Sequence, residues 1–271
     1  MIKHRIYKKL KNNYFSWKFL LNGKSTFKYF LKSKDNNSTH QQIVKDLNEK
    51  GISFCLFNEI FPEINFDNFL KEVNSRIEIF HQEDGTESLN EKVFANFILG
   101  LEPKFEKESL WNTIASSIVL QSVSDAYFQM QGTKMRYYNI WQHLSGFEEA
   151  SGSQLWHRDR EDLQILKIFI YLTNVDENGG PFTYAPSTHV KGNVFSKPEF
   201  IDENGVERST DEMMDKIVSS KKWITATAPK GTVVFADTHG YHKGGFVKEG
   251  NRILFTAMYV SPDCKRRYFK N

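Results

Sequence analysis

Two histidines and one aspartate are placed where they could share a metal ion. His157 and Asp159 stand two residues apart, just before the apolar run 165–173, so in an extended segment their side chains point to the same side. His242 lies in a glycine-bounded turn after another extended run, 231–237. Two histidines and one carboxylate on one face of a β-barrel are the ligand set of non-haem Fe(II) oxygenases, and they leave open positions on the metal. These residues therefore predict an iron site.

A lone arginine, Arg252, opens the next extended run ten residues after His242. The open positions on such an iron must accept a bidentate co-substrate and then dioxygen. A guanidinium in the barrel wall can hold the distal carboxylate of that co-substrate through two parallel hydrogen bonds. Arg252 therefore predicts a carboxylate-bearing co-substrate. His239, three residues before His242 in the same turn, is the competing candidate for the third ligand.

The elements that would position these residues change character near Gly132. Before it, residues 52–57 predict an edge strand, and apolar residues at helical spacing predict helices in three stretches, namely 42–50, 66–80 and 110–127, the last ending near Gly132. After it, β-branched and aromatic runs predict strands with no helices between them, at 134–144, 165–173, 181–184, 223–228, 231–237 and 252–261. This order predicts a mainly β fold, an antiparallel sandwich or barrel with the N-terminal helices packed outside it.

The second half of the chain, from about residue 134 to 261, resembles the phytanoyl-CoA dioxygenase family of Fe(II)- and 2-oxoglutarate-dependent oxygenases. Besides the triad, the likeness includes the strand 166–173, the turn 176–182 (Asp-Glu-Asn-Gly-Gly-Pro-Phe) and the turn 185–189 (Ala-Pro-Ser-Thr-His), where Ser187 replaces the family's glycine. The resemblance implies a double-stranded β-helix, that is, a cupin-like jelly roll.

The resemblance also implies how the chain is divided. A basic N-terminal extension and linker, 1–39, precedes a single oxygenase domain, 40–271. Within that domain we expect a helical part (40–132), a barrel core (133–262) and an insert that acts as a lid (191–222).

Carried over residue by residue, the resemblance implies that His157, Asp159 and His242 bind Fe(II) and form the catalytic centre. The family's second iron-binding histidine stands ten or eleven residues before the arginine, which His242 matches better than His239.

The resemblance further implies that Arg252 binds the C5 carboxylate of 2-oxoglutarate. Asn139 and Thr173 are additional candidates for contact with this co-substrate, because each lies on a predicted strand beside polar or aromatic neighbours. For Asn139 the alternative is a structural hydrogen bond within the barrel.

Asp159 also bears on the reaction. Related enzymes that transfer halogen have glycine or alanine at this position, which lets chloride reach the iron, whereas Asp159 fills it. The resemblance therefore implies hydroxylation of an unactivated C–H bond, with O2 consumed and succinate and CO2 released. The expected substrate is a small-molecule, lipid-, sugar- or carrier-linked metabolite. Desaturation or epimerisation at the same centre, and a non-catalytic binding or scaffold protein on the same barrel, are the alternatives.

Composition places the chain among ordinary globular proteins, with 271 residues, 39% of them hydrophobic and 25% charged. The two cysteines, Cys55 and Cys264, form neither a CxxC pair nor a zinc-binding spacing, which favours a reducing compartment. No run approaches the roughly 20 apolar residues that cross a bilayer, and the N-terminal segment lacks the apolar core of a signal peptide. We therefore expect a cytoplasmic protein.

The net charge of +3 is an average over two unlike parts. Residues 1–34, the basic head, hold ten Lys and Arg residues and no acid, so the head carries +10 and the remainder −7. Apolar residues recur at helical spacing among the lysines, as they do in amphipathic helices. Peripheral contact of the head with a membrane surface or polyanion is one interpretation, and a solvated extension packed partly on the body is the other. No nucleic-acid partner is expected.

Overall fold

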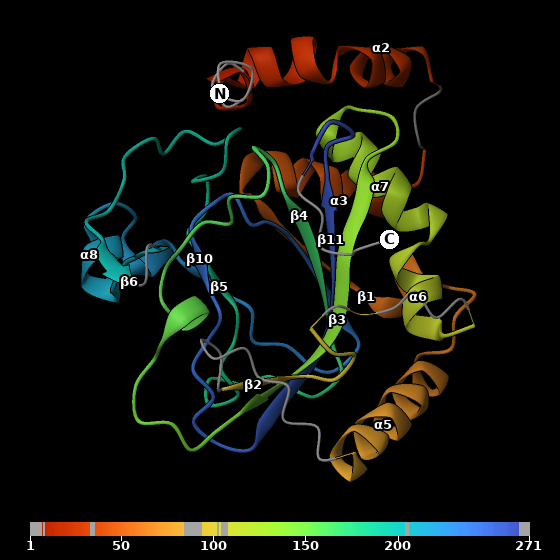
Figure 1. Ribbon diagram of the computed structural model, residues 1–271, viewed down its shortest axis with the longest axis vertical. Helices are drawn as coiled ribbons and strands as arrows, with labels where there is room; N and C mark the ends of the chain where they lie inside the picture. The colour runs from red at the N-terminus through yellow and green to blue at the C-terminus, as the bar shows by residue number, and fades with distance from the viewer. Residues whose placement is uncertain are drawn as a thin grey trace.

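In the computed structural model, two antiparallel β-sheets face each other, and helices cover the outer face of the larger sheet (Figure 1). The structure describes residues 7, 9–32, 36–83, 94–101, 103, 108–203 and 206–265. Within them, the larger sheet has the strand order β1-β9-β4-β11-β3-β2 and the smaller sheet the order β10-β5-β8. The strands of the larger sheet are β1 (Ile52–Leu56), β2 (Ala95–Phe97), β3 (Lys134–Leu144), β4 (Leu166–Tyr171), β9 (Thr232–Asp237) and β11 (Asn251–Val260). The other strands are β5 (Thr183–Tyr184), β8 (Ile224–Thr225) and β10 (His242–Lys243) of the smaller sheet, and β6 (Ile201–Glu203) and β7 (Val206–Arg208) of a separate pair.

The mainly β fold with flanking helices, predicted from the sequence, is confirmed. Each predicted strand is present, β1 lies at an edge of the larger sheet, and β3 has the predicted bounds. The two sheets are those of a jelly roll, but in the described residues no hydrogen-bonded ladder joins them into a closed barrel.

Helices occupy the first half of the chain and the insert. Those of the first half are the π-helix η1 (Ser16–Leu21), α2 (Gly23–Leu31), α3 (Ser38–Glu49), α4 (Phe57–Ile60), α5 (Phe66–Gln82), α6 (Leu110–Ala115) and α7 (Ile118–Phe128). The 3-10 helix η2 (Gly152–Gln154) follows β3, and the insert contains α8 (Asp211–Asp215) and the 3-10 helix η3 (Ser220–Lys222). No helix in the described ranges is long and apolar enough to span a membrane.

Strand β4 shows how the two faces of the larger sheet are used. Leu166, Ile168 and Ile170 pack in the main core with the apolar faces of α3, α5, α6 and α7. Phe169 and Tyr171 point the other way, into the space between the sheets. The alternation therefore places one wholly apolar face against the helices and directs the mixed face toward the interior where the site lies.

The end of helix α7 differs from the sequence prediction. The helix stops at Phe128 because Gln129 adopts the left-handed conformation, with φ of 52°, rather than continuing toward Gly132. Gly132, with φ of 82°, instead belongs to the turn before β3, where its backbone N–H donates to the Asp125 carboxylate. Gly132 therefore marks the turn, and the helix ends four residues earlier, at Phe128.

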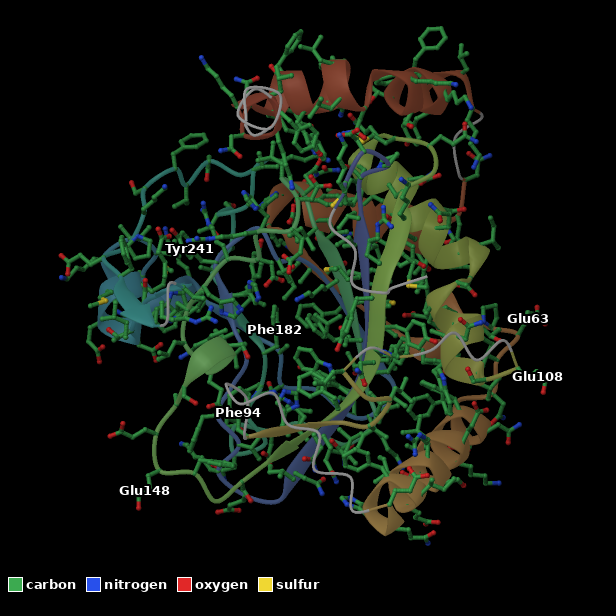
Figure 2. All side chains as sticks on the ribbon, in the orientation of Figure 1. Glu63, Phe94, Glu108, Glu148, Phe182 and Tyr241 are labelled. Atoms are coloured by element: carbon green, nitrogen blue, oxygen red, sulfur yellow. The ribbon has the colours of Figure 1, made fainter. Side chains whose placement is uncertain are left out.

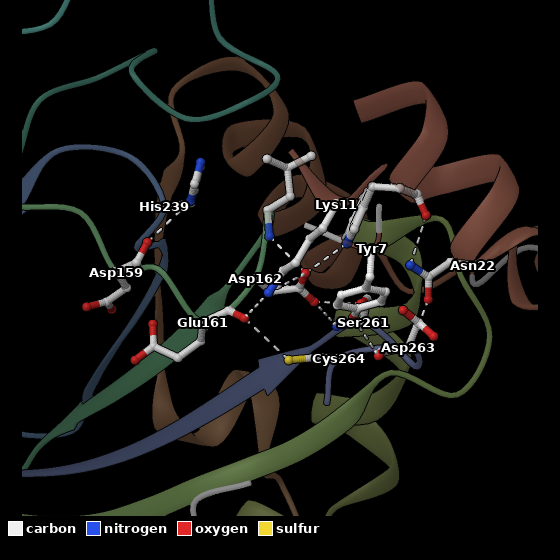
Figure 3. Close-up of polar contacts among 12 residues, drawn as sticks. Tyr7, Lys11, Asn22, Asp159, Glu161, Asp162, His239, Ser261, Asp263 and Cys264 are labelled. Carbon is white, nitrogen blue, oxygen red and sulfur yellow. Dashed lines mark hydrogen bonds and ion pairs between the residues drawn. The ribbon is translucent and has the colours of Figure 1, made fainter. Parts of the chain in front are cut away.

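The described part of the basic head packs on the body. Trp17 is 1% exposed, and its indole Nε1 donates to Asp162 Oδ1 at 2.8 Å. On the same side of the molecule, Asp263 N donates to Asn22 Oδ1 at 2.9 Å (Figure 3). The head is thus anchored at its middle, and α2 crosses the top of the molecule in Figure 1.

Candidate metal centre

Two backbone segments from distant parts of the sequence bring the predicted ligands together. His157 N donates to His242 O at 2.9 Å, and His242 N donates to His157 O at 3.0 Å. Asp159 N donates to Thr238 O at 2.9 Å, which extends this pairing by two residues. The segment around His157 and Asp159, called the ligand segment (155–160) below, is therefore fixed against the chain that leads into β10.

The three side chains form a compact cluster. One donor atom from each of His157, Asp159 and His242 lies within 4.8 Å of the others. The Nε2 atoms of His157 and His242 each lie 3.9 Å from a different oxygen of Asp159. Both imidazoles are buried, and their ring centroids are 4.2 Å apart. A metal ion between these atoms would be held on one face, with the opposite face open to other ligands.

Backbone carbonyls orient both imidazoles. His157 Nδ1 lies 2.8 Å from Leu155 O, and His242 Nδ1 lies 3.0 Å from Gly240 O. A carbonyl oxygen only accepts hydrogen bonds, so Nδ1 carries the proton in each ring and Nε2 presents a lone pair toward Asp159. The arrangement selects the tautomer that binds a metal through Nε2.

The charges of the cluster favour metal binding. Burial lowers the pKa of His157 and of His242, which keeps both rings neutral. Burial alone would raise the pKa of Asp159, but the Lys167 ammonium, 2.6 Å from Oδ2, outweighs it and holds this pKa below its ordinary value. The cluster therefore offers two neutral nitrogen donors and one carboxylate.

Lys167 is a member of the site that the sequence did not single out. Its Nζ lies 2.6 Å from Asp159 Oδ2, and the side chain is 17% exposed. The alternation of β4 placed Lys167 on the mixed face, and this was the available signal. Which residue it meets depends on the ligand segment, whose position relative to β4 is not encoded locally.

Arg252 lies in the same cavity as the cluster. This narrow cavity, of about 70 Å³, has walls that include the three cluster residues, Lys167 and Arg252. Arg252 is 2% exposed, and its Nε and Nη1 have no hydrogen-bond partner among the described residues. Burial lowers the pKa of Arg252 to about 10, so the guanidinium remains charged at neutral pH. A buried, unpaired guanidinium calls for an anion, and the distal carboxylate of 2-oxoglutarate fits that requirement.

The structure does not bring Asn139 to this cavity. Asn139 is fully buried on β3, its Oδ1 accepts from Leu99 N at 3.2 Å, and its Nδ2 donates to Gly100 O at 2.8 Å. The carboxamide is thereby used to fix the loop after β2. These contacts correspond to the alternative role given above for Asn139, a structural hydrogen bond within the barrel. They do not support a contact of Asn139 with the co-substrate.

Thr173 is also outside the cavity walls, although it is close to Arg252 in the fold. Its Oγ1 accepts from the backbone N–H of Ile253 at 3.1 Å, which ties the end of β4 to the start of β11. Thr173 therefore supports the strand that carries Arg252 rather than lining the cavity.

His239, the competing ligand candidate, lies on the other side of the ligand segment. Its Nδ1 is 3.3 Å from the backbone oxygen of Asp159, and Figure 3 shows the Asp159 carboxylate directed away from it. His239 is not part of the cluster found in the described residues, whereas His242 is.

Comparison with known proteins agrees with this geometry. The model of the family "Phytanoyl-CoA dioxygenase (PhyH)" matches residues 64–248, more than half of the chain. No curated protein gives a significant match.

Solved structures with the same fold are distant in sequence. One is the epimerase SnoN in complex with Fe3+, alpha ketoglutarate and nogalamycin RO (TM-score 0.58, 10% identity, 83% of this chain and 85% of that chain). Another is EctD from S. alaskensis with bound Fe (TM-score 0.58, 12% identity, 89% and 83%). A third is the alpha ketoglutarate-dependent carbocyclase SnoK (TM-score 0.54, 14% identity, 89% and 88%). Because the family model matches more than half of the chain, the chain belongs to the phytanoyl-CoA dioxygenase family and is an iron- and 2-oxoglutarate-dependent oxygenase.

Proposed function

We propose that the chain hydroxylates an unactivated C–H bond of a small organic substrate, with His157, Asp159 and His242 as the iron ligands. The observation that carries this proposal is the single cavity in which the three donors and the unpaired Arg252 meet. Bound iron supplies oxidation of the C–H bond by O2, coupled to conversion of 2-oxoglutarate to succinate and CO2. Asp159 occupies the position that a halide would need, which favours hydroxylation over halogen transfer.

The residues of the chain bind and orient the reactants. Leu155 O and Gly240 O hold the imidazoles with Nε2 toward the metal position, and Lys167 holds one oxygen of Asp159. Arg252 would fix the co-substrate by its distal carboxylate. Phe169 and Phe182, whose ring centroids are 5.0 Å apart, form an apolar wall that excludes water.

The test is turnover of 2-oxoglutarate by the purified chain with Fe(II) across a panel of metabolites. We expect substrate-dependent succinate release and oxygen uptake, and a product that contains one oxygen atom from labelled O2. A product without added oxygen would identify the reaction as epimerisation or desaturation instead of hydroxylation. Absence of both turnover and metal binding would favour the non-catalytic alternative and contradict the proposal.

The role of Arg252 can be tested apart from turnover. In Arg252→Ala we expect 2-oxoglutarate affinity to fall by about 10- to 100-fold, the loss of a charge-assisted double hydrogen bond, with metal affinity retained. Arg76→Ala, whose arginine lies on the distant helix α5, is the control. Titration of each Mn(II)-loaded variant with 2-oxoglutarate measures the co-substrate affinity, and titration of the metal-free variant with Mn(II) measures the metal affinity. An unchanged 2-oxoglutarate affinity in Arg252→Ala would refute the role.

We infer that the insert 191–222 covers the outer side of the ligand segment, within a single oxygenase domain. Trp156 Nε1 donates to Asp211 Oδ1 of the insert at 2.7 Å, and the ring of Trp223, the residue directly after the insert, lies 4.7 Å from the Trp156 ring. Trp156 and Ser209 also exchange backbone hydrogen bonds of 3.1 and 2.9 Å. These contacts support a cover that is fastened beside His157.

We further propose that the basic head contacts an anionic membrane surface. Six large apolar side chains of the head are between 45% and 72% exposed, namely Phe15, Phe19, Leu20, Phe27, Phe30 and Leu31. Lys24, Lys28 and Lys32 are exposed on and just after α2, and residues 7–32 contain no acid. Aromatic and aliphatic side chains surrounded by lysines suit a bilayer with anionic lipids, which attracts the cations and accepts the apolar groups.

Vesicle sedimentation tests the membrane contact. The intact protein should bind phosphatidylserine-containing vesicles and not pure phosphatidylcholine, and Phe27→Glu/Phe30→Glu should remove this binding. Ile118→Glu, at a 74% exposed apolar residue of α7, is the matched control and should bind normally. Failure of the intact protein to bind, or a dimer in solution that the double variant dissociates, would refute the membrane assignment.

A further inference from the structure

A second cavity lies behind the ligand segment. In this extended segment successive side chains point to opposite sides, so His157 and Asp159 face the metal site while Trp156 and Arg158 face the other way. The cavity on that other side has a volume of about 610 Å³, within the range of about 300 to 1,000 Å³ typical of small-molecule sites. It shares no wall residue with the cavity of the metal site.

Three parts of the chain close around this cavity. The head contributes Lys11, the ligand segment contributes Arg158 and Arg160, and the insert contributes Lys197 and Phe200. Tyr241, next to His242, forms another part of the wall. Figure 2 shows Tyr241 near the insert, whereas Phe182 and Phe94 of the metal-site cavity lie nearer the middle of the molecule.

The charges of this cavity do not balance. Lys11 lies 4.0 Å from Asp162, and Arg160 Nη2 lies 2.6 Å from Glu207 Oε2, so these two cations are matched. Arg158 and Lys197, which also line the cavity, form no ion pair among the described residues. The cavity thus carries an excess of two positive charges.

Arg158 lacks both an ion-pair partner and a hydrogen-bond partner for one of its nitrogens among the described residues. Its Nη2 donates to Thr188 O at 2.6 Å, and the guanidinium lies 4.0 Å over the Tyr241 ring. Its Nε is buried and has no hydrogen-bond partner in the described structure. The carboxylates of Asp237 and Glu207 act on this charge from a distance, but neither forms an ion pair with it. A partly buried guanidinium that is held only by a carbonyl and an aromatic ring is oriented but unpaired, and an anion would stabilise it.

We propose that this second cavity binds a small organic phosphate monoester, with the phosphate at Arg158 and Lys197 and the organic part against Phe200 and Tyr241. At neutral pH a phosphate monoester carries about −1.5 to −2 charges, which matches the excess of the cavity. Its oxygens suit the planar guanidinium, and the two aromatic residues offer an apolar surface for a ring. This site is separate from the iron and co-substrate site and does not rest on the proposed hydroxylation.

Isothermal titration calorimetry of the full chain without metal or 2-oxoglutarate tests the site. AMP is the probe, with adenosine and inorganic phosphate as its two halves. We expect AMP to bind, phosphate to bind more weakly, and adenosine not to bind at the same concentration. Binding of adenosine as tight as that of AMP, or no binding of AMP at millimolar concentration, would overturn the proposal.

Variants locate the probe within the molecule. Lys197→Gln, at an exposed residue that should not affect folding, should weaken AMP binding about tenfold, the effect of one charge-assisted contact. Arg158→Gln should weaken it more, with folding checked by thermal unfolding. Lys216→Gln, on the same insert but outside the cavity, is the charge-matched control and should bind as the wild type does. An equal loss in Lys216→Gln, or a loss in Arg252→Ala without one in Lys197→Gln, would place AMP elsewhere and refute the site.

Discussion

Backbone carbonyls, not neighbouring side chains, set the orientation of the two metal-site histidines. Leu155 O and Gly240 O each lie two residues before the ring that they hold, at 2.8 and 3.0 Å. The local chain therefore fixes each tautomer by itself, and no second side chain is needed for it. Single substitutions of the ligands should consequently act on metal binding directly.

We expect His157→Ala and His242→Ala each to reduce Fe(II) affinity by more than about 100-fold, since each removes a donor rather than a supporting group. His239→Ala should retain the affinity, because His239 faces the backbone of Asp159 and the second cavity. Equilibrium dialysis with Fe(II) under anaerobic conditions measures all three. Retention in His242→Ala with loss in His239→Ala would reverse the assignment.

The ion pair of Lys167 with Asp159 leads to a prediction about the metal-free protein. In Lys167→Met, Asp159 keeps its buried charge without a partner, which should lower the free energy of unfolding by about 3 kcal/mol. Mn(II) should restore most of this loss, because the metal neutralises the same carboxylate, so the rise in Tm on metal addition should exceed that of the wild type.

Lys230→Met, at an exposed lysine, is the control for that experiment. It should change neither the free energy of unfolding without metal nor the rise in Tm on addition of Mn(II). Thermal unfolding with and without Mn(II) gives both numbers. Equal stability of Lys167→Met and the wild type without metal would show that the ion pair does not support the site.

At the residue scale, sequence patterns were sufficient for some members of the site and not for others. His157, Asp159 and His242 follow from spacing and family likeness, since an extended segment fixes the direction of neighbouring side chains. Lys167 and Asn139 sit on correctly predicted strands, but their partners come from other segments. A contact across the fold is decided by packing, which one strand's pattern does not contain.

At the scale of elements, two glycine-containing turns meet where β10 leads toward β11. Gly180 has φ of 70°, and a Cβ there would lie 2.6 Å from Gly245 O. A Cβ on Gly245 would overlap the backbone of Gly180 and Pro181. The two turns touch backbone to backbone, so neither position has room for a side chain.

Gly245→Ala should therefore lower the free energy of unfolding by about 1 to 3 kcal/mol, because the overlapping atoms are backbone and cannot rotate away. Gly23→Ala is the matched control, since a Cβ there meets nothing within 4 Å and lies at the start of α2. Urea unfolding followed by circular dichroism measures both variants. A Gly245→Ala protein as stable as Gly23→Ala would contradict the close approach.

Element bounds show where sequence patterns lose accuracy. The 134–144 prediction equals β3, whereas 181–184 and 223–228 shrink to the two-residue strands β5 and β8. Alternation with a period of two indicates an extended chain, but a strand also requires hydrogen-bonded partners along its length. In the smaller sheet each pairing extends over only two residues. Helix α7 ends before Gly132 for a different reason. Gln129 adopts the left-handed conformation, which is usually adopted by glycine or asparagine, so the sequence did not mark this helix end.

At the scale of the whole molecule, the head is a structural part of the body as well as a charged extension. Asp162 is 2% exposed and accepts a hydrogen bond from Trp17 Nε1. It also accepts from the backbone N and the Oγ of Ser261 (Figure 3). One carboxylate thereby joins the head, the ligand-segment region and the end of β11. The composition revealed the charge of the head, but not this buried anchor.

Trp17→Phe should lower the free energy of unfolding by about 2 kcal/mol, because Asp162 loses a charge-assisted hydrogen bond in a buried place. Phe27→Ala, at a 65% exposed residue of the same head, should change it by less than about 0.5 kcal/mol. Guanidinium unfolding separates the two effects. Equal stability of the two variants would mean that the head is not anchored through Trp17.

The paired backbone hydrogen bonds between His157 and His242 also have a consequence for biosynthesis. The two histidines belong to segments that are separated by β4, β5, the insert, β8 and β9. A nascent chain therefore has no complete iron site until residue 242 has left the ribosome and the two segments have paired. With the proposed ligands, iron can be held by all three donors only after these two segments have paired, which places metal uptake late in the folding of the chain.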